Sequence, residues 1–256
     1  MAHGRRRNVR VDAAAGTVRV EPGATLGDVD HETQAHGLAV PVGVNSTTGI
    51  AGLTLGGGFG WITRKYGMTI DNLLSADVVL ASGDCVRASP RENPDLFWAL
   101  RGGGGNFGVV SSFEFRAHPV GPEVLSGLVI HPFEAAAELL PKFQELCDRA
   151  PDDLTIWSVL RKAPPLPFLP EEWHGREVLI FAACYSGGMA EGEVAMRDLR
   201  ALGSPIVDVI GPHPFTGWQA AFDPLLTPGA RNYWKSRDFM GLSAGTIRAI
   251  LEAVGD

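Results

Sequence analysis

One stretch, residues 41–60, constrains the fold of this chain more than any other. Its sequence, PVGVNSTTGIAGLTLGGGFG, holds seven glycines and no charged residue. Glycine loses more backbone entropy on folding than any other residue, so such a run is costly inside an ordinary helix or strand. Apolar residues are interleaved with the glycines, whereas a free linker would be polar. The stretch therefore predicts a half-buried loop whose backbone closely approaches a ligand.

The loop's hydroxyls indicate what that ligand carries. Ser46, Thr47 and Thr48 follow one another, and short hydroxyls beside backbone N–H groups suit a phosphate. A second glycine run, RGGGGNFGVV at 101–110, separates a predicted helix from a predicted strand. We expect the two runs to meet around one flat, phosphate-bearing ligand. The alternative is a glycine-rich turn that holds no ligand.

Two common nucleotide-binding motifs do not fit. A Rossmann site needs G-x-G-x-x-G between a strand and a helix, and GGGFG at 56–60 has the wrong spacing. Asp77 stands near the distance expected for a ribose-binding acid, but it falls inside a predicted strand. A phosphate-binding P-loop needs Gly-Lys followed by Ser or Thr, which the sequence lacks.

Charge and composition exclude several classes of partner. The net charge of −7 and the pI near 5.5 argue against a nucleic-acid partner. No apolar run is long enough to span a membrane, and no signal-peptide core follows the N-terminal arginines. The three cysteines lack paired metal spacing, so we expect no metal site and a cytoplasmic location. The oligomeric state stays open.

The hydrophobic pattern predicts an α+β fold in two parts, with a boundary at the PVGP sequence of 119–122. We therefore expect domains at 1–119 and 120–256. In the first part the expected elements are strands at 8–12, 17–21, 76–81, 84–88 and 107–115, a helix opened by a capping box of Thr25 and Asp28, a short helix at 60–67, and a helix at 93–102 capped by Asn93. In the second part they are strands at 124–131, 154–161, 176–185, 205–210 and 231–237, helices at 133–149, 189–202, 214–221 and 243–254, and a proline-rich surface loop at 163–175.

Three motifs in order carry a resemblance to a known family. The glycine loop, WITRKYG at 61–67 and RGGGGNFGVV at 101–110 together resemble the PCMH-type FAD-binding domain of the vanillyl-alcohol oxidase superfamily. The chain is most similar to bacterial oxidases of the berberine-bridge-enzyme type. The resemblance runs from about Asn8 to about Pro119 and is looser beyond.

This resemblance implies an α+β fold with a partial FAD-binding domain, followed by a substrate domain whose sheet is covered by helices. It implies an FAD-dependent oxidase that moves hydride from a small organic substrate to the flavin, with O₂ as acceptor. The cofactor-binding residues implied by the family pattern are Gly43, Thr47, Thr48, Gly49, Gly52, Gly57, Gly58, Gly60 and Val110. If Gly58 approaches the flavin ring, Gly58→Val would abolish flavin binding while the fold survives.

Two departures from the family pattern concern the flavin linkage. Some members carry a cysteine bonded to the ring in GVCPTVG, where this chain has GVNSTTG with Asn45. The family's attachment histidine lies in an R-G-G-G-H motif, which this sequence lacks; His3 has no such context. We therefore expect FAD to be held non-covalently. We also expect a chain without the family's first βα unit and its C-terminal return segment, and hence a weak or inactive oxidase.

The sequence RNYWKS at 231–236 supplies the candidate catalytic residues. On a strand, Tyr233 and Lys235 would share one face and could take a proton from the substrate. In the alternative interpretation Tyr233 packs against the protein and Lys235 is solvated. Two other functions stay open for the whole chain: a catalytically inactive remnant, and a nucleotide-binding module without turnover.

Overall fold

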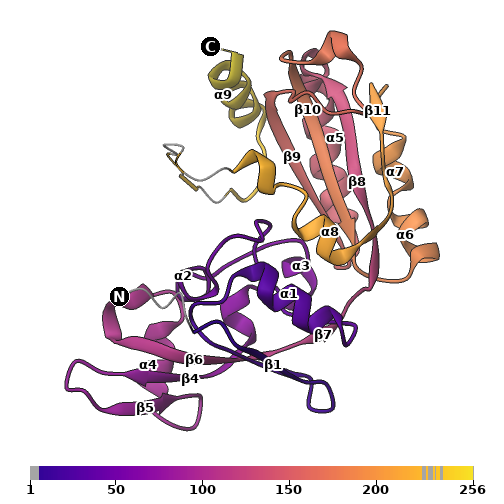
Figure 1. The fold of residues 1–256 in the computed structure, drawn as a ribbon. Helices are drawn as coiled ribbons and strands as arrows, with labels where there is room; N and C mark the ends of the chain where they lie inside the picture. Colours follow the sequence, from indigo (N-terminus) through magenta and orange to yellow (C-terminus); the bar gives the residue numbers. More distant parts are fainter. Residues whose placement is uncertain (1–5, 227–228, 230–232, 234, 237–238, 256) are drawn as a thin grey trace. The chain divides into compact units, whose positions relative to one another are not determined.

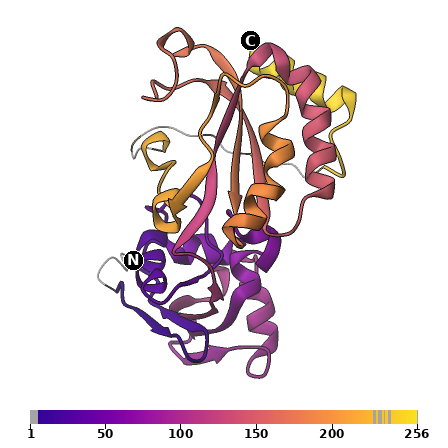
Figure 2. The ribbon, with the colours of Figure 1, turned by 90° about the vertical axis from the view of Figure 1, so that its right-hand side faces the viewer.

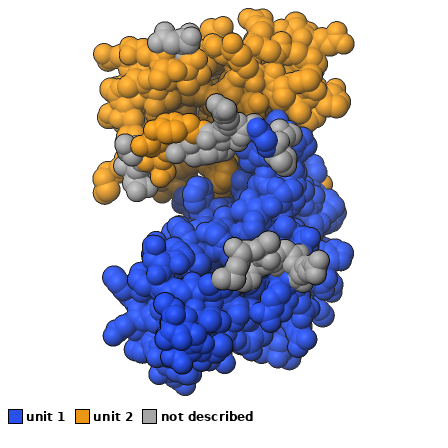
Figure 3. Space-filling view, turned by 60° about the vertical axis from the view of Figure 1, so that its left-hand side comes forward, with its two compact units in different colours: residues 1–124, 213–230 blue, residues 125–212, 231–256 orange. Residues whose placement is uncertain are grey.

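The computed structural model of the chain describes residues 6–226, 229, 233, 235–236 and 239–255. The chain forms two compact units, which Figure 3 colours separately. Unit 1 holds residues 1–124 and 213–230, and unit 2 holds residues 125–212 and 231–256. The first division lies close to the expected boundary at 119–122. The return of 213–230 to unit 1 was not expected and corrects the sequence-based assignment of that segment.

Unit 1 is built on a five-stranded antiparallel sheet (Figure 1). In spatial order its strands are β1 (Val9–Asp12), β2 (Thr17–Val20), β6 (Val109–Arg116), β4 (Leu73–Val79) and β5 (Cys85–Ala88). Along β2, Val18 and Val20 are fully buried while Arg19 between them is exposed. This period-2 pattern gives the sheet one apolar face toward the core and one charged face. All five predicted strands are confirmed.

Short helices surround this sheet. They are α1 (Leu26–Gln34), α2 (Ile50–Leu55), α3 (Thr63–Tyr66), α4 (Pro94–Leu100) and α8 (Phe215–Gln219), with 3₁₀ turns η1 (Thr69–Asn72), η2 (Gly104–Phe107) and η5 (Asp223–Leu225). A two-stranded sheet pairs β3 (Leu38–Ala39) with β7 (His118–Pro119). The capping box that opens α1 is confirmed, since Thr25 and Asp28 each bond the other's backbone N–H.

Two local expectations in unit 1 need correction. Asn93 precedes α4 with a left-handed φ of 49°, and its side chain makes no cap bond. Its Nδ2 donates instead to the Arg87 carbonyl at 2.7 Å. In addition, helix α2 forms inside the stretch that the sequence predicts to be a loop, because Ile50 and Leu55 find buried positions there.

Unit 2 is a second antiparallel sheet, in the order β11 (Val207–Asp208), β8 (Glu123–Pro132), β10 (Glu177–Tyr185) and β9 (Leu154–Lys162), and β12 (Gly211–Pro214) also pairs with β8. Its helices are α5 (Ala136–Arg149), α6 (Met189–Ala195), α7 (Arg197–Arg200) and α9 (Ala244–Gly255), with turns η3 (Phe133–Ala135) and η4 (Glu171–Trp173). Helix α5 runs along one face of the sheet (Figure 2), where Phe143 stacks on Phe181 with ring centroids 5.0 Å apart.

The proline-rich loop packs on part of the other face of that sheet. Leu169 is only 4% exposed and packs with Val178 and Ile180 of β10. Strand β10 is buried on both faces along nearly its whole length, which explains its continuous apolar sequence. The expected strand at 231–237 lies mostly outside the described residues. Tyr233, Lys235 and Ser236, which are described, have no regular secondary structure.

Candidate cofactor site in the glycine-rich loop

The two glycine runs meet within unit 1, as the sequence predicts. Helix α2, which lies inside the first run, contacts η2, which lies inside the second run. Helix α2 also contacts η1, so the first run is supported from a third segment. The site is therefore assembled from two parts of the chain, 50–55 and 104–107, that lie about fifty residues apart in the sequence.

Some glycines of the loop are required by the protein's own packing. A Cβ atom on Gly60 would collide with the Val42 carbonyl, and one on Gly58 with the Thr69 side chain. A Cβ on Gly43 would lie 3.0 Å from Leu53, and one on Gly57 would lie 2.7 Å from Met68. Gly57 and Gly58 also have positive φ angles, of 117° and 76°. Gly60 lets two backbone segments pack closely, and the other three leave room for side chains of Thr69, Leu53 and Met68, whether or not a ligand binds.

Other glycines face open space. A Cβ atom added at Gly49, Gly52 or Gly105 would meet no atom within 4 Å, and all three residues are exposed. None of the three has a positive φ, so backbone conformation does not require glycine there. Gly52 even lies inside α2, where glycine is about 1 kcal/mol less favourable than alanine. A ligand pressed against this backbone would account for the absence of side chains.

Asn45 organises the hydroxyls of the loop. Its Oδ1 accepts from the Thr47 N–H at 3.0 Å and from the Thr47 hydroxyl at 2.5 Å. The Thr48 hydroxyl lies 3.5 Å from the same oxygen. This is an Asx-type turn, in which a side-chain oxygen takes the place of a backbone acceptor. The threonine hydroxyls that the sequence assigns to a phosphate are thus directed at Asn45.

Val110 lies where strand β6 pairs with β4. Its side chain is 5% exposed and belongs to the core of unit 1, with Val78 as its cross-strand partner. Only its backbone is therefore available to a ligand. Gly108, two residues earlier, has a φ of 145°, and a Cβ there would press on the Val79 carbonyl at 2.6 Å. This close approach fixes where β6 begins.

A carboxylate that the sequence analysis does not single out binds the glycine loop through Ser46. Asp223, in η5, accepts the Ser46 N–H at 2.8 Å through Oδ1, and its Oδ2 accepts the Ser46 hydroxyl. The two residues are 177 positions apart. No local pattern could have indicated this pairing, because each residue is ordinary in its own surroundings.

A second unpredicted contact holds the loop's first glycine. Gln219 of α8 donates through Nε2 to Asp30 at 3.1 Å and to the Gly43 carbonyl at 3.4 Å. Asp30 is 2% exposed, and burial raises its pKa to about 7, against the lowering effect of the Gln219 bond. Among the described residues, Asp30 Oδ1 and Gln219 Oε1 have no hydrogen-bond donor. A proton on the carboxyl group would supply the donor that this cluster lacks.

Aromatic side chains of the segment 213–230 also pack against Trp61 of unit 1. The Trp218 ring lies 5.1 Å from Trp61 and 5.8 Å from Phe222, and Trp61 lies 5.8 Å from Phe222 between ring centroids. Trp61 begins the WITRKYG motif directly after the glycine loop. The loop and the motif are therefore both packed against the returning segment.

Tyr233 and Lys235 belong to unit 2, whereas the glycine loop belongs to unit 1. Tyr233 is 85% exposed, and the Lys235 ammonium lies 5.6 Å from the centre of its ring. Within the described part of the chain, no group of three or more histidine, cysteine or acidic residues could hold a metal ion. No described helix has the length and apolar character needed to cross a membrane.

Comparison with known proteins shows what the chain is similar to. A family profile described as an FAD binding domain matches residues 2–89. An FAD-linked oxidoreductase of Dictyostelium discoideum is 34% identical over 251 residues, which are 96% of this chain and 52% of that protein. The (R)-6-hydroxynicotine oxidase of Paenarthrobacter nicotinovorans is 39% identical over 245 residues, 95% of this chain and 52% of that protein. The solved structure of BBE-like protein #28 from Arabidopsis thaliana is 28% identical with a TM-score of 0.72, over 85% of this chain and 44% of that one.

Residues 2–89 thus match an FAD binding domain, and nearly the whole chain is similar to FAD-linked oxidoreductases of the berberine-bridge-enzyme-like kind. It spans about half the length of the curated relatives it matches. The resemblance carried by the three motifs and the predicted α+β fold are thereby confirmed. The open backbone at Gly49, Gly52 and Gly105 fits the approach of a dinucleotide such as FAD.

Proposed function

We propose that the chain is part of an FAD-dependent oxidase, with unit 1 as the flavin-binding domain and unit 2 as the substrate domain. The observation that carries the proposal is the meeting of two glycine runs whose outward glycines, 49, 52 and 105, leave the backbone open. When bound, FAD would accept a hydride from a substrate C–H bond, and O₂ would take the electrons on. The relative that oxidises 6-hydroxynicotine supports a small organic substrate.

The chain's own residues have the following roles in this proposal. The backbone of Gly49, Gly52 and Val110 would contact FAD directly, and Asn45 would hold the intervening turn in shape. The packed glycines, 43, 57, 58 and 60, would set the position of that backbone from within the protein. Thr47 and Thr48 would contribute by turning their hydroxyls away from Asn45, because the N–H groups of both residues already donate to Asn45.

In this proposal residue 45 forms no covalent bond to the flavin. The Asn45 side chain is an amide, which forms no thioether, and its oxygen already accepts bonds from Thr47. Protein denatured with acid and pelleted should therefore release flavin to the supernatant from any chain that contains only these 256 residues.

The proton released by the substrate's O–H or N–H group needs an acceptor. We propose Tyr233, with the Lys235 ammonium beside its ring. The Tyr233 side chain is 85% exposed and so open to a substrate, and tyrosine is among the side chains that act as general acid–base catalysts. Tyr233→Phe should lower turnover by about 10²-fold or more with little change in FAD affinity.

The decisive experiment titrates the purified chain with FAD and follows absorbance near 450 nm, anaerobic bleaching by candidate substrates and peroxide formation in air. Saturable FAD binding with substrate-dependent bleaching supports the oxidase. FAD binding without bleaching by any amine, alcohol or sugar would favour an inactive remnant. Binding of other adenine nucleotides in preference to FAD would favour a nucleotide-binding module.

A further inference from the structure

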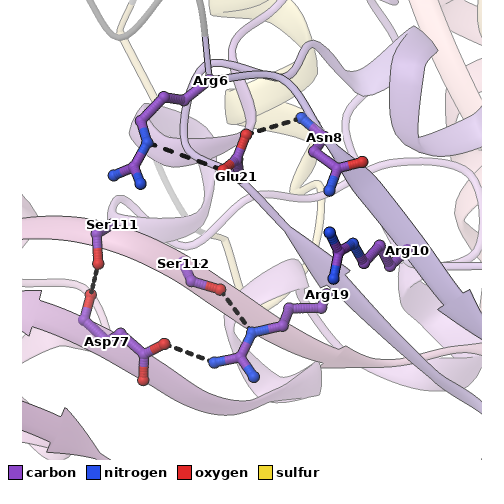
Figure 4. A pocket seen from close by; sticks show the side chains of 8 residues that line it. All are labelled: Arg6, Asn8, Arg10, Arg19, Glu21, Asp77, Ser111 and Ser112. Carbon is purple, nitrogen blue, oxygen red and sulfur yellow. Dashed lines mark hydrogen bonds and ion pairs between the residues drawn. The ribbon is translucent and has the colours of Figure 1, made fainter.

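A polar groove of about 280 Å³ lies on the charged face of the unit 1 sheet (Figure 4). Its lining comes from β1, β2, β4, β6 and the residues that flank β1 and β2. It includes no residue of 43–60 or 101–110. None of the residues proposed to contact the flavin therefore lines the groove.

Positive charge exceeds negative charge in this groove. Three arginines, Arg6, Arg10 and Arg19, line it together with two carboxylates, Glu21 and Asp77. Arg19 is paired through Nη2 with Asp77 at 2.5 Å, and Arg6 lies 3.8 Å from Glu21. Among the residues that the structure describes, the Arg10 guanidinium has no hydrogen-bond or ion-pair partner. One full positive charge is left without a counter-charge.

Strand pairing places this charge beside another of the same sign. Arg10 of β1 is directly opposite Arg19 of β2 in the antiparallel register. Directly opposed side chains in such a pair are close enough to interact, and like charges there destabilise the sheet. Asp77 neutralises the charge of Arg19 but not that of Arg10. A bound dianion between the two guanidinium groups would convert the repulsion into attraction.

The free donors of the groove suit a phosphate. Arg19 uses Nε toward Ser112 Oγ at 2.9 Å and Nη2 toward Asp77, so its Nη1 is open. The Ser112 oxygen acts as an acceptor in that bond, which leaves its hydroxyl proton to donate. Arg10 offers a complete guanidinium fork. Two guanidinium groups and a hydroxyl around one space form the donor pattern that binds tetrahedral oxyanions bidentately.

We propose that this groove binds an oxyanion of the phosphate class between Arg10 and Arg19. The proposal rests on the charged face of unit 1 and does not require that the chain be an oxidase. Two sources of the oxyanion share this chemistry: a free phosphate or phosphorylated small molecule, and the diphosphate of FAD itself.

Isothermal calorimetry of the full chain with inorganic phosphate tests the proposal. We expect one saturable site that weakens as chloride is raised, because the donors are exposed. Arg10→Gln should weaken binding by about tenfold, since a charge-assisted hydrogen bond is lost. Phosphate should raise the melting temperature of the parent chain more than that of Arg10→Gln.

Arg116→Gln is the matched control. Arg116 is an exposed arginine at the end of β6 that does not line the groove, so this variant has the same net charge as Arg10→Gln. Its phosphate affinity should equal that of the parent. Equal weakening in both variants, or no saturable binding in the parent, would overturn the proposal. Ser112→Ala provides a second groove variant if Arg10→Gln does not fold.

A competition arm separates the two sources. If saturating FAD leaves phosphate binding unchanged, the groove is a site for a separate phosphorylated molecule. If FAD abolishes phosphate binding in the parent and Arg10→Gln also weakens FAD, the oxyanion is the diphosphate of FAD. FAD binding that fails altogether, with phosphate binding intact, would count against the proposed oxidase and leave the oxyanion site standing.

Discussion

At the scale of single residues, the glycines of one loop have two different reasons to be there. Gly58 and Gly60 are needed because protein atoms occupy the space a side chain would take. Gly49 and Gly52 face open space and have no such need. Substitutions in the two classes should therefore fail in different ways, one by loss of fold and the other by loss of ligand.

Gly52 offers a test in which stability and binding change in opposite directions. Gly52→Ala should raise the free energy of unfolding by about 1 kcal/mol, because alanine favours the interior of α2. Gly52→Leu should remain folded and reduce FAD affinity at least about tenfold, since its side chain would occupy the proposed contact. Urea unfolding and flavin titration measure the two effects.

The control for Gly52→Leu is Gly211→Leu, at an equally open glycine of unit 2. It should bind FAD as the parent does. Normal FAD binding by Gly52→Leu would remove Gly52 from the proposed site.

Gly58→Val should destabilise the fold itself. The sequence-based expectation was that the variant would lose flavin binding while the fold survives. Valine at a φ of 76° is strained, and its Cβ would collide with Thr69 and lie 2.9 Å from Leu53. We expect a loss of about 2–5 kcal/mol of unfolding free energy. Urea denaturation checks this. A fully stable variant without flavin would instead support direct contact of Gly58 with the ring.

At the scale of elements, the segment 213–230 is the least expected part of the fold. It follows the strands of unit 2 in the chain and then packs on α1, the glycine loop and the WITRKYG motif of unit 1. Phe215 and Trp218 are 1% and 6% exposed. The loop that carries the proposed flavin contacts is thus held from a part of the chain far away in sequence.

Asp223→Ala tests this support. The substitution removes the acceptor of both the Ser46 N–H and the Ser46 hydroxyl. We expect a loss of about 2 kcal/mol of stability, faster hydrogen exchange in residues 44–49 and weaker FAD binding. Hydrogen-exchange mass spectrometry and flavin titration measure these effects.

Asp223→Asn keeps one acceptor oxygen and should lie between the parent and the alanine variant. Unchanged exchange in 44–49 after Asp223→Ala would show that the aromatic cluster of Trp61, Trp218 and Phe222 holds the loop without help from the carboxylate.

At the scale of the whole molecule, each unit has its own hydrophobic core and its own buried titratable group. Asp30 in unit 1 has a pKa raised to about 7 by burial. His131 in unit 2 is fully buried, and burial lowers its pKa. The two groups favour their neutral forms, so they respond to pH in opposite directions.

The stability of unit 1 should fall as pH rises from about 4 to about 7, because an unfolded aspartate ionises near 4 and the folded one near 7. The full difference is about 4 kcal/mol. Unit 2 should behave oppositely: the contribution of His131 is present above about 6.5 and is lost as pH falls below it. Native-state hydrogen exchange of α1 and β10 between pH 4 and 8 reports the two slopes separately.

Two isosteric variants serve as controls for the pH prediction. Asp30→Asn should abolish the slope of unit 1 and stabilise it at pH 8, because an amide can donate to Gln219 Oε1 and still accept from Nε2. His131→Phe should abolish the acid slope of unit 2. Equal slopes in α1 and β10, or a slope in α1 that survives Asp30→Asn, would contradict the assignment.

Local sequence patterns predicted most of the strands and helices and the resemblance to FAD-linked oxidases. The alternation of VRVD and TVRV, the Thr25–Asp28 capping box and the two glycine runs are recognisable because each depends on neighbours within a few residues. The cap predicted at Asn93 was wrong, because its side chain donates to the Arg87 carbonyl, six residues earlier, and not to the first turn of α4.

Only the tertiary structure decided which glycines are packed and which are open, because that depends on Val42, Thr69 and Leu53 rather than on the glycines' own neighbours. It also decided that Asp30 is buried and that residues 213–230 leave unit 2. The Ser46–Asp223 pair joins residues 177 positions apart. Such contacts arise from the shared burial of apolar surface around Trp61 and Trp218, and no local spacing in the chain encodes them.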